Sequence, residues 1–137
     1  MRRYFLVLLA TALALGVASP CLARCLGYEP KSVTLTGEIV HRKLPGPPNY
    51  RSVVRGDRPE SVYFLVLDQP VCVSGDPTSR LNTRSHAGIT EIQLLISPVE
   101  GSSAAGKRKR ISGTLSSAQS GYHRTPVLLT VKQMKPA

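Results

Sequence analysis

The stretch Ser61–Val73 reads SVYFLVLDQPVCV and contains the longest apolar run outside the extreme N-terminus. Residues 62–67 are all apolar or aromatic, and the β-branched and aromatic types among them favour strands. The run is too short for a globular helix and lies between the turn formers Gly56-Asp57 and Asp68-Gln69-Pro70. We therefore predict a central strand that is buried on both faces. Pro70 should sit at a bulge or an edge, because proline cannot donate a ladder hydrogen bond.

Four other segments have the residue pattern of strands. They are Val33–Val40, Ile89–Ile96, Ile111–Leu115 and Thr125–Val131. After the third strand, Ser97-Pro98-Val99-Glu100 combines a capping serine, a proline and an acidic residue, which predicts a short helix that ends at Gly106. The order of three strands, one helix and two strands is typical of a small five-stranded OB-like Greek-key barrel. A small β-sandwich is the alternative all-β fold.

The inward faces of these strands define the predicted core. Side chains of a strand alternate between its two faces, so the apolar face of each strand is expected to point inward. Glycines within two of the strands, Gly37 and Gly113, leave room for the strong bends of a small barrel. The predicted core residues are Val33, Leu35, Ile39, Phe64, Val66, Ile92, Leu94, Leu115, Val127, Leu129 and Val131.

Residues 1–23 have the pattern of a secretory signal peptide. Two arginines at positions 2 and 3 are followed by an apolar segment over residues 5–18 and by small residues before Arg24. A membrane anchor is the weaker interpretation, because a spanning helix needs about 20 apolar residues. A lipoprotein acylated at Cys21 is weaker still. We expect a periplasmic or secreted protein whose residues 24–137 form one domain, with no transmembrane segment in the mature chain.

Export would leave two cysteines, Cys25 and Cys72, in the mature chain. Disulfides persist in oxidising export compartments, so this pair predicts a bridge from the mature N-terminus to the central strand. The chain has no C-x-x-C motif, and the residues after Cys25 do not form an evident helix N-terminus. A catalytic thiol is therefore the weaker interpretation.

The charge of the mature chain favours anionic partners. Residues 24–137 hold 16 of the 18 basic residues and all 8 acidic residues, a net charge of about +8. A basic balance of this size suits cell-surface polymers, phospholipid headgroups or acidic proteins, although it also serves solubility alone. Nucleic acid is not an expected ligand, because an exported protein does not normally meet it.

The strongest local charge is the run Lys107–Arg110, KRKR, where the fourth strand begins. Alternation turns Arg108 and Arg110 outward if Ile111 points inward. Arginine suits carboxylates and phosphates because its planar fork donates two parallel hydrogen bonds. This pair is the main candidate for ligand binding, and a solvated strand end is the alternative interpretation.

Two loops supply three further candidate ligand-binding residues. Tyr50 lies in the proline-rich connection Arg42–Arg58, where it would either contact a ligand or pack back on the barrel. His123 and Arg124 lie on a tight turn before the last strand, where they could help to bind an anion. We expect these three residues to support the arginine pair of the basic run.

No catalytic or metal-binding motif connects the candidate acids, bases and ligands. These candidates are His41, His86, His123, Asp57, Asp68 and Asp76. The sequence lacks G-x-S-x-G, H-E-x-x-H and paired-carboxylate spacing. We therefore predict a monomeric, non-catalytic binding module without a cofactor or a metal, whose partner is an anionic envelope component. The alternatives are an interaction or structural protein of the envelope and, less favoured, a hydrolytic or metal-dependent enzyme.

A set of short motifs spans nearly all of the mature chain. The motifs are Cys25–Pro30 with Val33–Gly37, PGPPNY at Pro45–Tyr50 with Gly56-Asp57, PVCV at Pro70–Val73, EIQL at Glu91–Leu94, Gly106-Lys107-Arg108, ISGTL at Ile111–Leu115, and His123 with TPVLLTV at Thr125–Val131. Their combination resembles an uncharacterised family of exported bacterial proteins, domain of unknown function 4431. The resemblance implies a small, exported, β-rich domain with no assigned activity. The family tends to carry a histidine-rich turn before TPVLL, whereas this turn has one histidine, which argues against a metal role.

Overall fold

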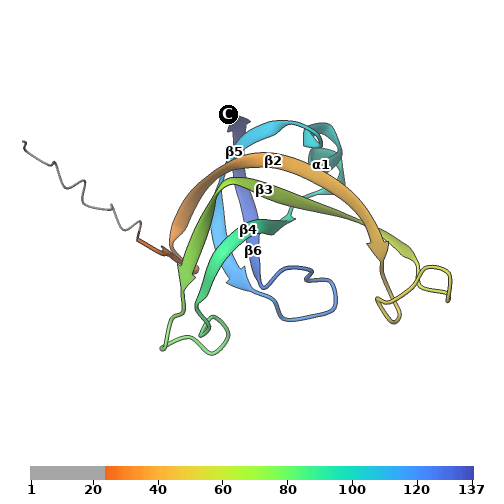
Figure 1. Cartoon of the computed structure of the whole chain (residues 1–137), viewed down its shortest axis with the longest axis horizontal. Coiled ribbons are helices and arrows are strands. Elements are labelled where there is room, and N and C mark those ends of the chain that lie inside the picture. The colour runs from red at the N-terminus through yellow and green to blue at the C-terminus, as the bar shows by residue number, and fades with distance from the viewer. Residues whose placement is uncertain (1–23) are drawn as a thin grey trace, which may run out of the picture.

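The computed structural model describes residues 24–137, which contain six strands and one short helix (Figure 1). The elements are β1 (Leu26–Gly27), β2 (Ser32–Pro45), β3 (Pro59–Ser74), β4 (His86–Leu95), α1 (Pro98–Ala104), β5 (Arg108–Ser117) and β6 (Val127–Pro136). The signal peptide expected at residues 1–23 lies outside the described residues. In residues 24–137, no helix is both long and apolar enough to cross a membrane.

All six strands belong to one mixed sheet. Its order is β1-β3-β2-β5-β6-β4, and β3 also pairs with β4. The ladder pairs therefore form a circuit: β2 pairs with β3, β3 with β4, β4 with β6, β6 with β5, and β5 with β2. The pairs β1–β3 and β4–β6 are parallel, and the others are antiparallel. Figure 1 shows β2 and β3 arching side by side over the other long strands. This single sheet differs from the two sheets of a β-sandwich.

The long strands extend beyond the predicted segments because each pairs with different neighbours along its length. Residues 32–38 of β2 pair with β5, and residues 37–45 pair with β3. At the changeover, a Cβ atom on Gly37 would lie 2.1 Å from the Val66 carbonyl oxygen, so only glycine permits this approach. The predicted strand ends at Val40 because the polar residues after it break the apolar alternation. The two-residue β1 was not predicted.

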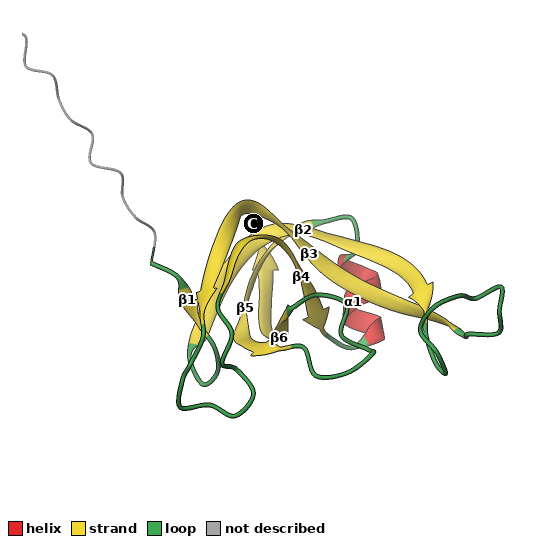
Figure 2. Cartoon of the chain, turned by 60° about the horizontal axis from the view of Figure 1, so that its bottom comes forward, coloured by secondary structure: helices red, strands yellow, loops and turns green. Residues whose placement is uncertain are grey.

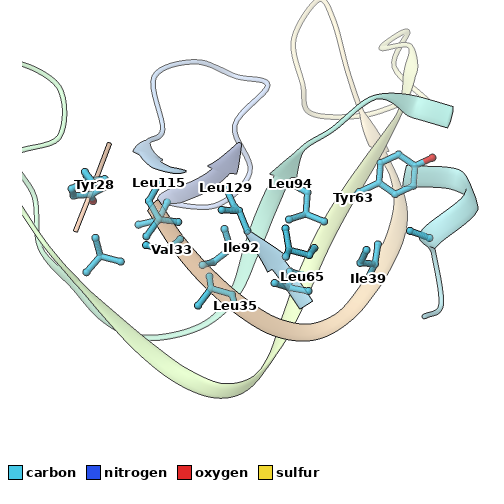
Figure 3. Close-up of a cluster of buried hydrophobic side chains, with 14 residues drawn as sticks. Tyr28, Val33, Leu35, Ile39, Tyr63, Leu65, Ile92, Leu94, Leu115 and Leu129 are labelled. Atoms are coloured by element: carbon cyan, nitrogen blue, oxygen red, sulfur yellow. The ribbon is translucent and has the colours of Figure 1, made fainter. Parts of the chain in front are cut away.

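The core lies on the inner side of the arched sheet (Figure 3). The buried cluster comprises Tyr28, Val33, Leu35, Ile39, Tyr63, Leu65, Val73, Ile92, Leu94, Ala104, Ile111, Leu115, Val127 and Leu129. Figure 3 shows the labelled members pointing into one shared space. The residues predicted on β2, β4 and β5 are therefore core residues. On β6, Val131 is only half-buried and packs against the cluster.

The prediction for β3 was wrong about which side chains face the core. Tyr63 and Leu65 point into the cluster, whereas Val66 is 37% exposed. Phe64 is buried, at 2% exposure, but outside this cluster. The reason is alternation: Phe64 follows Tyr63 and precedes Leu65, so it lies on the other face of the sheet. Pro70 lies within the irregular stretch of the β3–β4 ladder between Val66 and Val71, as expected for a proline in a strand.

The helix and the disulfide both agree with the sequence predictions. The Ser97 hydroxyl accepts a hydrogen bond from the Glu100 N–H at 3.3 Å and donates to the Glu100 carboxylate at 2.6 Å. Gly106 adopts a φ of 77° just after the helix, a conformation that glycine favours. Cys25 and Cys72 form a disulfide, which ties the segment before β1 to the far end of β3. Figure 2 shows β1 at that end of the molecule.

Candidate functional site

The two arginines of the basic run lie on the outward face of β5. Ile111 is fully buried, so alternation turns Arg108 and Arg110 to the outer side, and both are exposed. In the ladder, Arg108 lies opposite Glu38 of β2, and Arg110 lies opposite Thr36 of β2 and opposite Lys135 of β6. The predicted orientation of this pair therefore agrees with the structure.

Arg108 is already paired with a carboxylate of the same chain. Its Nε donates to Asp68 Oδ1 at 3.2 Å, and its Nη2 donates to Asp68 Oδ2. Asp68 belongs to β3, so the Arg108 side chain passes over β2 to reach it. The hydrogen bond from Arg108 and its charge hold the pKa of Asp68 below its usual value. Sequence reasoning missed this partner because 40 residues separate the two.

The other cations on this side form no ion pair within residues 24–137. The ion pairs there involve Arg42, Arg108 and Arg124 only. Arg110 and Lys135 face each other across the β5–β6 ladder, and both are exposed. This arrangement leaves two adjacent positive charges without a carboxylate partner among the described residues, and such a pair attracts anions.

Arg124 joins two loops instead of facing solvent. Its side chain is 14% exposed, and its Nη2 donates to the Pro45 carbonyl oxygen at 2.5 Å and to Glu60 Oε2 at 3.2 Å. The guanidinium carbon lies 5.2 Å from the centre of the Tyr50 ring. The Arg124 N–H also donates to Gln93 Oε1. Arg124 therefore fastens the segment before β6 to the β2–β3 connection.

Tyr50 and His123 are also held by contacts within the protein. The Tyr50 ring meets the Tyr122 ring edge-on, with centroids 5.3 Å apart. This matches the interpretation in which Tyr50 packs back on the protein. His123 Nδ1 accepts hydrogen bonds from the N–H groups of Gln119 at 2.7 Å and Ser120 at 3.3 Å, which shapes its own turn.

The five predicted site residues form two separate groups. Arg110 lies opposite Thr36, and Arg124 contacts Pro45, nine residues further along β2. At roughly 3.3 Å per residue, these positions are about 30 Å apart along the strand. Arg124, His123 and Tyr50 therefore cannot support Arg108 and Arg110 around one small ligand. Sequence reasoning placed both groups at the start or end of strands and could not show that these ends lie far apart.

A polar cluster on the outer face of β2, β3 and β4 was not predicted. Arg42 donates to both carboxylate oxygens of Glu91, at 2.7 and 2.6 Å. The same guanidinium lies 4.6 Å from the centre of the Phe64 ring. Gln93 donates from its side chain to the Tyr122 carbonyl oxygen at 2.9 Å. These contacts cover Phe64 and explain why an aromatic residue outside the main core is buried.

The acidic residues considered for catalysis have structural partners. Asp57 accepts hydrogen bonds from the N–H groups of Asn49, Arg51 and Ser52, each at 2.8 Å. Asp76 accepts from the N–H and hydroxyl of Thr78. In the described part of the chain, no three histidine, cysteine or acidic side chains are grouped so that they could hold a metal ion.

We expect Asp57→Asn to destabilise the protein more at neutral pH than in acid. Hydrogen bonds from the N–H groups of Ser52, Arg51 and Asn49 hold the pKa of Asp57 below its usual value. Such a carboxylate stabilises the fold above its unfolded pKa of about 4, and this contribution is lost as the pH falls through the lower folded pKa. Urea unfolding midpoints of wild type and variant should therefore differ at about pH 7 and converge towards about pH 2. A difference that is constant with pH would contradict this role.

Residues 91–135 match the family model described as Domain of unknown function (DUF4431). The match begins within β4, includes α1 and β5, and ends near the end of β6. This match agrees, over residues 91–135, with the family resemblance that the sequence motifs indicated. Neither a curated protein nor a solved structure matched the chain.

Proposed function

We propose that this protein is an exported binding module that holds an anionic envelope partner on the outward face of β5. The observation that carries the proposal is the adjacent pair Arg110 and Lys135, which lie opposite each other, exposed, and outside every ion pair of residues 24–137. Lys107 and Lys109 add positive charge at the same strand end. The net charge of about +8 favours encounter with an anionic surface.

An OB-like barrel is part of this proposal. The circuit of ladder pairs through the five long strands, the parallel pairing of β4 with β6, and the helix between β4 and β5 support this architecture. In OB domains, ligands commonly bind across the second and third strands of the barrel and the flanking loops. Here that face is already occupied by contacts within the chain. Arg42 pairs with Glu91, the Gln93 side chain donates to the Tyr122 carbonyl oxygen, and Arg124 pairs with Glu60. We therefore place the ligand on β5 instead.

Export is the second part of the proposal. The Cys25–Cys72 disulfide supports it, because disulfides are stable in the periplasm and outside the cell and are rare in the cytosol. The signal-peptide pattern of residues 1–23 supports it independently. In such a compartment, the accessible anionic polymers are those of the cell envelope and its surroundings.

We expect Arg110→Ala/Lys135→Ala to weaken binding to an immobilised anionic polysaccharide, alginate, roughly tenfold, because each exposed ion pair contributes up to about 1 kcal/mol. Binding should also weaken as salt rises, since charges are screened beyond about 8 Å at physiological ionic strength. Surface plasmon resonance at low and at physiological salt measures both effects.

The matched control for this experiment is Arg55→Ala/Arg58→Ala. These two arginines are exposed in the β2–β3 connection and form no ion pair within the described chain, so the control has the same net charge as the test variant. It should bind alginate like wild type. Equal loss in both variants, no loss in either, or binding that ignores salt would show that the β5 face is not the site.

A further inference from the structure

The ladder between β2 and β3 stops before either strand ends. Its last pair is Gly37 with Leu67, so residues 32–36 of β2 pair with β5 on one edge only. Two cavities of about 260 and 450 Å³ lie along this opening. Both are lined by Thr34, Leu35 and Val71, so they form one continuous groove beside the unpaired edge of β2.

The free edge of β2 presents backbone groups to this groove. The Ile39 N–H donates to the Lys107 carbonyl at 3.0 Å, and the Gly106 N–H donates to the Ile39 carbonyl at 2.7 Å, so Ile39 directs its backbone groups towards the β5 side. Backbone groups alternate along an antiparallel strand, so Thr34 and Thr36 direct theirs to the opposite edge. An edge of this kind binds an extended peptide by strand addition.

The opposing edge of β3 already accepts one extended segment. At Val73, one edge of β3 pairs with His86 of β4, so β1, which pairs Leu26 with Val73, must occupy the other edge. That edge carries β2 up to Leu67 and β1 from Val73, and it is open between them. Within the opening, Pro70 has no N–H to donate, so a ladder with an added strand would form on β2.

The charges beside the groove select an acidic strand. Arg108 reaches over β2 to Asp68, and Asp68 lines the smaller cavity. Arg110 lies two residues further along β5, points to the same side and stands opposite Thr36, at the point where β3 has left β2. A carboxylate on an added strand would therefore lie within reach of the Arg110 guanidinium, in the same relative position that the Asp68 carboxylate has to Arg108. Arg24 lines the larger cavity and adds a second cation.

We propose that this groove binds an extended acidic segment of a partner protein as an added strand along residues 32–36 of β2. The proposal rests on the proposed function and names the class of anionic partner. Side chains of an added strand alternate, so one set would contact Leu35 and Val71 and the other would face Arg110. The recognised segment is therefore one in which acidic and apolar residues alternate. A second copy of this chain is disfavoured, because two chains of about +8 repel each other.

The test measures binding of the full chain to a fluorescent peptide of alternating glutamate and valine, about seven residues long, by anisotropy. Two N-methylated versions block the N–H groups on one peptide edge or on the other. We expect one version to bind at least roughly tenfold more weakly and the other to bind like the parent, because only one edge joins a ladder. The matching peptide with lysine in place of glutamate should not bind.

Protein variants test the location of the site. Val71→Glu places a negative charge in the groove and should weaken peptide binding at least roughly tenfold. Val66→Glu is the control, because it makes the same change on the same strand at a side chain outside both cavity linings. Thermal unfolding verifies that both variants fold. If Val71→Glu does not fold, binding of the N-methylated peptides to wild type still tests whether the peptide adds as a strand.

The outcomes separate this inference from the proposed function. Alginate binding that depends on Arg110 and Lys135, together with no peptide binding, would overturn the added-strand inference and leave the anionic binding module standing. Peptide binding that is insensitive to N-methylation on both edges, or equally weakened by both valine substitutions, would also overturn it. If wild type binds neither alginate nor the peptide, both proposals are overturned.

Discussion

Replacing Phe64 by alanine is expected to destabilise the protein by about 3–5 kcal/mol, the cost of removing a fully buried aromatic side chain. Phe64 is 2% exposed and lies on the face of β3 opposite Leu65. The Arg42 guanidinium lies 4.6 Å from the centre of the Phe64 ring and donates hydrogen bonds to both carboxylate oxygens of Glu91. The substitution would remove the apolar support of this pair as well as the buried surface.

Urea unfolding monitored by circular dichroism measures the change, and Val66→Ala is the control. Val66 lies on the same strand and the same side as Phe64 but is 37% exposed. Its truncation should cost no more than about 1 kcal/mol. If both variants lower the free energy of unfolding by similar amounts, the outer face of β3 does not contribute a second packed cluster. The contact between Phe64 and Arg42 would then contribute little to stability.

Replacing Cys72 by serine is expected to destabilise the protein by about 2–5 kcal/mol. The bridge to Cys25 spans a sequence separation of 47 residues, so its loss releases a long loop in the unfolded chain. In the folded chain the bridge holds the segment that leads into β1 against β3, where Leu26 and Gly27 form only a two-residue parallel ladder. We therefore expect β1 to detach before the rest of the sheet unfolds.

Reduction of the wild type provides the control for this experiment. A reductant should lower the unfolding midpoint of wild type to that of Cys72→Ser and leave the variant unchanged. Hydrogen exchange should show faster exchange at Leu26–Gly27 in the variant than in the oxidised wild type. Equal midpoints for the oxidised wild type and the variant would contradict a stabilising role for the bridge.

The positions of the five long strands and of the helix were predictable because they depend on neighbouring residues, whereas the two-residue β1 was not predicted. The apolar run of β3, the alternation of β2 and the capping serine of α1 are local signals, and each predicted the element that forms. The unbroken run also predicted that β3 is buried on both faces. It could not show which side chains face the main core, because an apolar run without alternation carries no information on the face. Tyr63 and Leu65 do so, and Phe64 does not.

The candidate site was only partly predictable for a related reason. The outward direction of Arg108 and Arg110 follows from the burial of Ile111 and the two-residue period of a strand, so it could be predicted. The partner of Arg108 could not, because Asp68 comes from a strand 40 residues earlier in the chain. The same holds for Arg124, whose contacts with Pro45 and Glu60 connect residues more than 60 positions apart.

The amino-acid sequence alone determined where the five long strands and the helix form, which cysteines would pair, and how strongly basic residues 24–137 are. These properties follow from side-chain chemistry and from interactions over a few residues. The folded structure was needed to show that the β2–β3 ladder ends at Gly37 and Leu67, that Arg108 is paired and Arg110 is not, and that Arg124 joins two loops. Each of these depends on segments that meet only after the chain has folded, because ladder register and ion pairing are set by distances in space and not by separation in sequence.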